Sequence, residues 1–355
     1  MSPFVQLVLL TRMRCVPFPL DTMHRSSHLS PVAVHVRLSE AELTALLAPF
    51  GVGPLRVARG IASGSINTNY RVESAKGTFF VRLAFGRSEE DLGLETRLLD
   101  LLREGGLPVV PPRRAEDGAA FVPFQGGALS VFPWSAGEPV PATEVSERHL
   151  WELGRILGRL HRLGAGFAAR RENPFGSATA AGWLAELTAS SGRGDAEVAA
   201  ALPAIGVGLA GAAALAGHGE TWIHADLFRD NVLWMGDRIG AVLDFEMACT
   251  APPVLDVAVT MLDWTWEEGR FSPRRVRPLV EGWRQALGPP AALPQAGLSG
   301  ALRFAAARFT LSRLRDFHFS PLSDDALVRK DWRRMRDRLS AALALGPAGI
   351  AALVG

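Results

Sequence analysis

Lysine is almost absent from this sequence: of its 38 Lys and Arg residues, only Lys76 and Lys330 are lysines. A phosphate-binding loop of the GxxxxGK[ST] type requires a lysine after its second glycine, so the sequence excludes that loop. Cysteine is equally rare, because Cys15 and Cys249 are the only two and lie far apart. Neither a disulfide framework nor a cysteine metal cluster is indicated, and we expect a reducing, cytoplasmic location.

The chain also has little net charge, since 38 basic and 36 acidic residues give +2 at pH 7. This balance gives no electrostatic reason to expect nucleic acid or a membrane surface as a partner. Long apolar runs are lacking too. Phe4 to Leu10 lacks the flanks of a signal peptide, and Ala204 to Ala216 is too short and too rich in glycine to span a bilayer. We therefore expect a globular protein with no nucleic-acid and no membrane partner.

The 355 residues, 48% of them hydrophobic, can bury a large core and predict two lobes. Residues 1–35 are predicted to be a poorly ordered extension. Residues 36–133 contain several strand patterns and 134–355 mainly helical ones, with the Pro- and Gly-rich stretch SVFPWSAGEPVP at the boundary. The predicted class is α+β, with a small antiparallel sheet in the first lobe and a larger helical second lobe.

Three stretches of the first lobe predict an antiparallel meander: Leu55–Ile61, Asn69–Glu73 and Thr78–Phe85. Backbone N–H groups of small residues can approach the anionic oxygens of a nucleotide, which makes the turn after the first strand a candidate phosphate cover. The residues concerned are Ser63, Gly64, Ser65 and Asn67. An ordinary hairpin loop is the alternative interpretation.

The most informative stretch, residues 222–246, lies within TWIHADLFRDNVLW, which begins at Thr221, and the following segment that ends with LDFE at Glu246. Apolar pairs flank a polar loop, which predicts strands on either side of Asp226 and Asn231, and a further short strand ends in Asp244. We expect these three side chains to meet at the end of one small sheet. Two carboxylates and an amide in this order are typical of phosphoryl transfer, because one carboxylate orients the accepting hydroxyl and the other groups hold Mg²⁺.

With HADLFRDNVL, LDFEMAC and LDVAVTMLDW in view, the chain resembles the aminoglycoside phosphotransferase-like superfamily, and within it the homoserine kinases of the kinase-fold type. The resemblance extends from about Val36 to about Leu345. It implies a bilobal protein-kinase-like fold that binds ATP and Mg²⁺ between its lobes. It implies that Asp226 is the catalytic base and that Asn231 and Asp244 hold the metal.

The resemblance also suggests supporting residues. Arg82 stands where kinases carry a phosphate-pairing lysine, and Glu95 on the next helix is its expected partner. Asp256 is expected to brace the catalytic loop through main-chain N–H groups, with His224 in a similar structural role. Glu246 occupies a place where many of the homoserine kinases that the chain resembles carry an aromatic residue.

The implied reaction is the phosphorylation of a small-molecule alcohol, foremost L-homoserine to O-phospho-L-homoserine in threonine biosynthesis. Arg308 and Arg313, on an Arg-rich helix, are candidates to bind a substrate carboxylate. Another small-alcohol or aminoglycoside phosphotransferase is the first alternative, and a nucleotide-binding module without catalysis is the second. A GxGxxG match at Gly206 to Gly211 lies in a helical segment and is not interpreted as a dinucleotide site.

Overall fold

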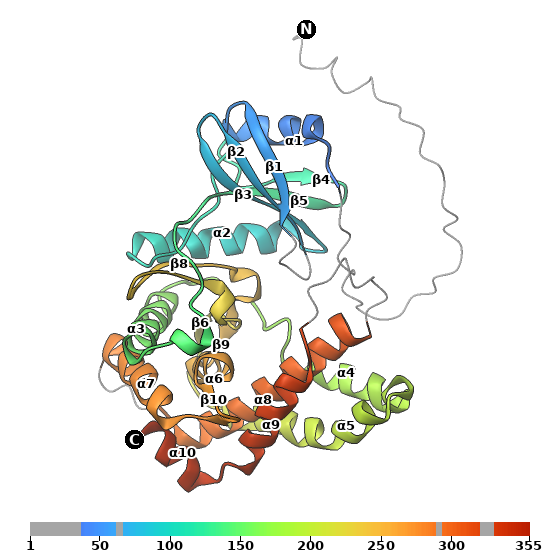
Figure 1. The fold of residues 1–355 in the computed structure, drawn as a ribbon, viewed down its shortest axis with the longest axis vertical. Helices are drawn as coiled ribbons and strands as arrows, with labels where there is room; N and C mark the ends of the chain where they lie inside the picture. Colours follow the sequence, from blue (N-terminus) through green and yellow to red (C-terminus); the bar gives the residue numbers. More distant parts are fainter. Residues whose placement is uncertain (1–36, 62–66, 289–292, 320–329) are drawn as a thin grey trace. The chain divides into compact units, whose positions relative to one another are not determined.

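The computed structural model describes residues 37–61, 67–288, 293–319 and 330–355, and all of these belong to one compact unit (Figure 1). Of the predicted phosphate cover, Ser63, Gly64 and Ser65 lie outside the described residues, and so does the whole of the predicted extension, residues 1–35. The α+β class with an N-terminal antiparallel sheet and a helical C-terminal part is confirmed.

The sheet lobe begins with helix α1 (Glu40–Leu47), capped by Ser39 and Glu42 in the capping box that their spacing predicts. Its five strands are antiparallel and lie in the order β1-β2-β3-β5-β4. Their bounds are β1 Leu55–Ile61, β2 Thr68–Ser74, β3 Gly77–Phe85, β4 Val122–Phe124 and β5 Gly127–Pro133. Helix α2 (Glu89–Glu104) follows β3, and its apolar stripe packs into the core of the helical lobe. The register sets Arg82 of β3 between Asn69 of β2 and Ser130 of β5.

Most of the remaining chain is helical. The long helices are α3 Glu147–Gly164, α4 Ser177–Ala189, α5 Ala196–Leu209, α6 Pro253–Trp264, α7 Pro273–Leu287, α8 Gln295–Arg313, α9 Arg333–Ala344 and α10 Pro347–Val354. Single turns are η2 Ala48–Phe50, η3 Ala142–Glu144, η4 Ser191–Gly194, η5 Ala210–Leu215, η6 Arg229–Asn231, η7 Phe245–Met247 and the π-helical η8 Leu314–His318. Their apolar faces form one core, which also includes Leu98 and Leu102 of α2.

The expectation of one small sheet around the central loop was wrong. The structure has two separate two-stranded sheets, one of β6 (Thr221–Ile223) with β9 (Cys249–Ala251) and one of β7 (Val232–Met235) with β8 (Arg238–Val242). A tight turn lets β7 and β8 pair with each other, and β6 is left to pair with the later β9. A third two-stranded sheet, the hairpin of β10 (Trp266–Glu267) with β11 (Arg270–Phe271), follows α6.

The helical stretch Ala196–Leu215, formed by α5 and η5, is longer than the apolar run considered in the sequence. Among the described residues it is the one helix long and apolar enough to cross a membrane, and α9 with α10 pass that test only as a pair bent by 108°. A single such helix is a weak indication, because core helices of globular proteins share these properties. Here Gly208 and Gly211 bring the stretch against α8, with Ala307 and Gly300 as neighbours.

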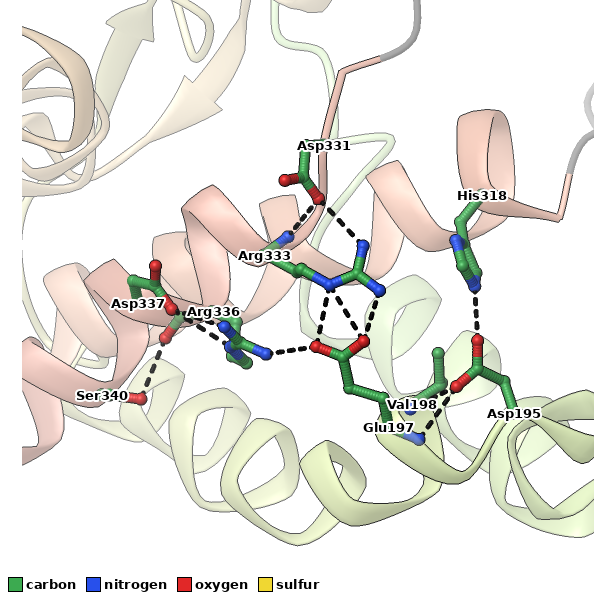
Figure 2. A network of polar contacts seen from close by, with 9 residues as sticks. All are labelled: Asp195, Glu197, Val198, His318, Asp331, Arg333, Arg336, Asp337 and Ser340. Carbon is green, nitrogen blue, oxygen red and sulfur yellow. Dashed lines mark hydrogen bonds and ion pairs between the residues drawn. The ribbon is translucent and has the colours of Figure 1, made fainter.

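Figure 2 shows the ion pairs that join the start of α5 to the chain around α8 and α9. Glu197 accepts hydrogen bonds from Arg333 at 2.8 Å and from Arg336 at 2.7 Å. Asp195, which caps α5, also accepts one from His318 at 2.8 Å. Each pair is exposed or partly exposed and contributes little alone, but together they hold these helix ends in register. Helix α8, which carries the arginines discussed below, is thus fixed at its C-terminal end.

Helices α3 and α7 pack so closely that glycine is required at their contact. A Cβ at Gly154 of α3 would fall on the carbonyl oxygen of Leu279, and one at Gly282 of α7 on that of Trp151. We expect Gly154→Ala to lower the free energy of unfolding by at least about 3 kcal/mol, since backbone atoms cannot move aside cheaply. Chemical denaturation monitored by circular dichroism measures this change.

Gly182→Ala in α4 is the matched control. Gly182 is exposed and nothing lies within 4 Å of its Cβ position, so alanine should leave stability unchanged or raise it by up to about 1 kcal/mol. Equal effects at both glycines would contradict the close helix contact.

Candidate active site

The loop between β6 and β7 brings Asp226 and Asn231 into direct contact. The Asn231 side-chain amide donates to the main-chain oxygen of Asp226 at 2.8 Å and to its carboxylate at 3.2 Å. Both donor hydrogens of Asn231 are thereby directed at Asp226, which leaves the amide oxygen Oδ1 free to bind a cation. The main-chain oxygen of Asn231 also accepts a hydrogen bond from Leu243, the residue before Asp244, at 2.9 Å.

Asp256, in the first turn of α6, holds the start of this loop from below. Its carboxylate accepts hydrogen bonds from the main-chain N–H groups of His224 and Ala225, both at 2.8 Å. Ala225 has a φ of 64°, which is unusual and costly for a residue other than glycine. Two charge-assisted hydrogen bonds to one buried carboxylate can maintain this strained backbone just before Asp226.

A buried histidine orients the Asp256 carboxylate in turn. His161 of α3 accepts a hydrogen bond from the indole of Trp283 at 2.9 Å through Nδ1, so its Nε2 carries the proton and donates to Asp256 at 3.0 Å. Burial alone raises the pKa of Asp256, but the bonds from His161 and the main chain outweigh it and hold that pKa below its usual value. Asp256 is therefore a carboxylate at neutral pH.

The far end of α6 braces the same loop, a feature that the sequence reasoning missed. Arg229 forms a two-pronged ion pair with Asp263 at 2.9 and 3.0 Å, and the indole of Trp264 donates to the main-chain oxygen of Leu227 at 2.9 Å. The spacing of Asp256 and Asp263, seven residues apart and hence on one helix face, was the available signal.

His224 joins the loop to the strand that ends in Asp244. Its Nε2 donates to the main-chain oxygen of Leu243 at 2.9 Å, and its Nδ1 accepts from the N–H of Asp226 at 3.3 Å. Burial lowers the pKa of His224, which favours this neutral form. Asp244 itself has a φ of 61°, a second non-glycine residue in the left-handed region. Its side chain stays accessible to solvent, although the protein around it strips enough water to raise its pKa.

Asp226 is half-buried, and burial raises its pKa to about 7, with the charge of Asp244 acting in the same direction. Arg308 and Lys330 oppose this rise. Because the charge of Asp244 raises the pKa of Asp226, the two carboxylates form a place of concentrated negative charge, which a divalent cation would stabilise.

In the sheet lobe, Arg82 and Glu95 are both buried, and Arg82 Nη2 donates to Glu95 at 3.0 Å. Arg87 also pairs with Glu95. A second contact of Arg82 was not foreseen, since its Nη1 lies 3.0 Å from the carboxylate of Glu246. The Nε of Arg82 is buried and has no hydrogen-bond partner in the described part of the chain.

These groups suit a metal-bound nucleotide. No set of three or more His, Cys, Asp or Glu side chains arranged for a metal occurs in the described ranges. Mg²⁺ bound with a nucleotide needs only one or two protein oxygens, because phosphate oxygens and water complete its shell. Asn231 Oδ1 and the Asp244 carboxylate are hard oxygen donors of the right kind, and the guanidinium of Arg82 is a donor group suited to phosphate.

The two candidate arginines of α8 differ in their surroundings. Arg308 is 4% exposed and lies over the rings of Phe309, at 3.8 Å, and Phe175, at 5.0 Å. It forms no hydrogen bond or ion pair with another residue of the described segments. Arg313 donates to the main-chain oxygen of Asp331 at 3.1 Å. Burial lowers the pKa of the Arg308 and Arg313 guanidinium groups to about 10, although the negative charge of Asp226 partly opposes this effect at both.

The fold and this site define a protein-kinase-like small-molecule phosphotransferase. Residues 57–293 match the phosphotransferase enzyme family. A homoserine kinase of Xanthobacter autotrophicus is 33% identical over 308 residues, 84% of this chain and 92% of that protein. One of Pseudomonas aeruginosa is 35% identical over 288 residues, 80% and 88% of the two chains. The chain therefore belongs to the phosphotransferase enzyme family, in its homoserine kinase branch.

Solved structures support the fold at lower sequence identity. A spectinomycin phosphotransferase in complex with ADP and spectinomycin has a TM-score of 0.62 at 14% identity and covers 86% of this chain and 97% of its own. A choline kinase from Streptococcus pneumoniae has a TM-score of 0.58 at 15% identity, with 88% and 99% covered. Kinases named for such different acceptors share this architecture, so the fold alone does not determine the acceptor, which depends on the residues that line each site.

Asp256→Asn tests the brace of the loop. Asparagine keeps the shape but cannot accept from His161 and both main-chain N–H groups, so we expect a loss of about 2–4 kcal/mol in the free energy of unfolding. The pKa of Asp256 is lower in the folded protein than in the unfolded chain. The stabilisation by Asp256 is therefore fully present above about pH 4, and it is lost as the pH falls through the pKa of Asp256 in the folded protein. Urea denaturation between pH 3 and 7 should therefore give a shallower acid dependence for the variant.

Asp337→Asn, at an exposed position of α9, is the control and should change stability by less than about 0.5 kcal/mol. An Asp256→Asn protein with the stability and acid dependence of the wild type would contradict the bracing role.

Proposed function

We propose that this protein is an ATP- and Mg²⁺-dependent kinase that converts L-homoserine to O-phospho-L-homoserine, a step of threonine biosynthesis. The homoserine kinase relatives over most of the chain support the reaction. The observation that carries the choice of acceptor is the buried guanidinium of Arg308, close enough to Asp226 for each charge to shift the pKa of the other.

The surroundings of Arg308 favour the binding of an anion. Its charge is buried, its described contacts are aromatic ring faces, and no carboxylate of a described residue pairs with it. An unpaired buried charge is costly, so an acceptor that brings its own carboxylate gains a charge-assisted, two-pronged hydrogen bond. Phe309 and Phe175 hold the guanidinium plane in place for such a contact.

The same charge argues against the alternative acceptors. Aminoglycosides and choline are cationic and carry no carboxylate, so Arg308 would repel them at close range. L-homoserine has a carboxylate for Arg308 and a terminal hydroxyl two methylene groups further on, which can extend toward Asp226. A nucleotide-binding module without catalysis is disfavoured because Asp226, Asn231 and Asp244 are all present around the loop.

The roles of the residues follow from their positions. Asp226 accepts a hydrogen bond from the substrate hydroxyl and takes its proton during transfer. Asn231 and Asp244 would hold Mg²⁺, which supplies charge neutralisation for the phosphates. Arg82, oriented by Glu95, contributes a fixed positive charge to the phosphate side, while Arg308, with Arg313 further along α8, neutralises the acceptor side. Positioning and charge stabilisation supply most of the acceleration in phosphoryl transfer.

An acceptor panel tests the reaction. With ATP and Mg²⁺, we expect rapid ADP release with L-homoserine and little with choline or kanamycin, measured by a coupled ADP assay. Asp226→Asn should reduce kcat by roughly 10²- to 10⁴-fold, because the general base is lost. ADP release with kanamycin but not homoserine, or full turnover by Asp226→Asn, would contradict the proposal.

Arg308→Met tests the carboxylate contact. The variant should raise the KM for L-homoserine by roughly 10- to 100-fold, since a charge-assisted hydrogen bond contributes about 1.5–3 kcal/mol. Its activity with 3-aminopropan-1-ol, a cation that is homoserine without the carboxylate, should be unchanged or higher, because the repulsion by Arg308 is also removed.

Arg303→Met is the matched control on the same helix, because Arg303 donates instead to main-chain oxygens of Ala342 and Leu345. It should leave the ratio of the two KM values as in the wild type. An equal loss toward both acceptors in Arg308→Met would refute the carboxylate contact.

A further inference from the structure

Glu246 is the last residue of the stretch 222–246, here called the catalytic segment, and follows Asp244 by two residues, yet its carboxylate contacts the sheet lobe. One oxygen lies 3.0 Å from Nη1 of Arg82 and also accepts a hydrogen bond from the side-chain amide of Asn67. The side chain is only 13% exposed. Glu246 thus links strand β3 and the residue before β2 to the end of the catalytic segment.

Arg82 can form this link because it is an arginine. Its Nη2 faces Glu95 of α2 while its Nη1 faces Glu246, so one planar fork holds two carboxylates in different directions. A lysine ammonium is a compact charge and would not span both partners with the same geometry. Arg82, which stands where kinases carry a lysine, and Glu246, which stands where many of the homoserine kinases that the chain resembles carry an aromatic residue, are therefore the two halves of one ion pair.

The ion pair of Arg82 with Glu246 places a carboxylate at the position where the negatively charged phosphates of a nucleotide would bind. Glu95, Glu246 and Asp244 all act on Arg82, while Arg87 is the other nearby cation acting on Glu95. Phosphate groups that approach Arg82 would meet the Glu246 carboxylate at close range, in a setting with little water to screen the repulsion. A phosphate and Glu246 would compete for the same Nη1 donor.

We propose that Glu246 is a positioning residue that occupies the Nη1 arm of Arg82 and yields it to the phosphates when a nucleotide binds. Before a nucleotide binds, Glu246 keeps the buried guanidinium of Arg82 paired and oriented. When the phosphates displace Glu246 from Arg82, the hydrogen bond between Glu246 and Asn67 is also affected, so nucleotide binding is coupled to that contact. The proposal rests on the nucleotide-binding part of the proposed function and is independent of the acceptor.

Glu246→Gln provides the direct test, because it keeps the shape and removes the competing charge. The melting temperature measured without nucleotide should fall, since Arg82 loses a charged partner. The Kd for MgATP, measured by isothermal titration calorimetry, should nevertheless decrease roughly three- to tenfold, as the fraction of protein with Arg82 available rises. The same gain should appear with ATP in EDTA, because the competition concerns phosphate rather than metal.

Two further variants keep the test decisive if Glu246→Gln folds poorly. Asn67→Ala removes the other partner of Glu246 without burying an unpaired charge, and should tighten MgATP binding by about two- to threefold. Glu73→Gln removes an exposed carboxylate of the same lobe, paired with Arg71 on β2, and should alter neither melting temperature nor Kd.

The outcomes separate the possibilities. Unchanged or weaker binding by Glu246→Gln and Asn67→Ala, with the wild type binding MgATP normally, would overturn the inference alone and leave the proposed kinase function standing. Weaker binding only when Mg²⁺ is present would identify Glu246 as a metal ligand, which also overturns it. A wild-type protein that binds no nucleotide at all would instead refute the proposed function.

Discussion

The site depends on one buried carboxylate, that of Asp256. It accepts three hydrogen bonds, two from main-chain N–H groups at the start of the loop and one from His161, itself fixed by Trp283. The cost of burying a charge is offset only when its hydrogen-bonding capacity is met in this way. The strained backbone at Ala225 and the orientation of Asp226 are consequences of that anchor. The core helices α3, α6 and α7 therefore determine the loop's geometry from beneath, and the chemistry is placed on a rigid base.

Arginine rather than lysine defines the charge arrangement. Arg82 has two carboxylate partners, Glu95 and Glu246, and is correspondingly immobile. Arg308 has aromatic faces around it and no carboxylate partner among the described residues. The pairing of Arg82 suits a site where the phosphates of a nucleotide displace a carboxylate that is already bound. The surroundings of Arg308 suit a site where the acceptor supplies the only carboxylate. In the proposed reaction, Arg82 would serve the nucleotide and Arg308 the acceptor.

Much of the fold could be predicted from local pattern. Alternating apolar residues gave the strand of Leu55–Ile61 at its observed bounds, and the Ser39–Glu42 spacing predicted the first helix cap. The joining of the central strands could not be predicted, because short apolar runs specify that a strand forms but not which strand it pairs with. Hence one sheet was expected where two separate two-stranded sheets exist. The role of Asp263 was missed for a related reason, since an ion pair to Arg229 depends on the path of the loop over α6.

The sequence alone determined the class of protein, because the spacing of Asp226, Asn231 and Asp244 between apolar runs is specific to one kind of chemistry. It also identified Arg82 and Glu246 as unusual residues at their positions. Only the tertiary structure decided that these two contact each other, and that Arg308 rather than another arginine of α8 is buried without a partner. Spacing along a chain indicates local geometry only. Arg82 and Glu246 are 164 positions apart, and whether such distant charges pair depends on how the helices and the sheet pack together.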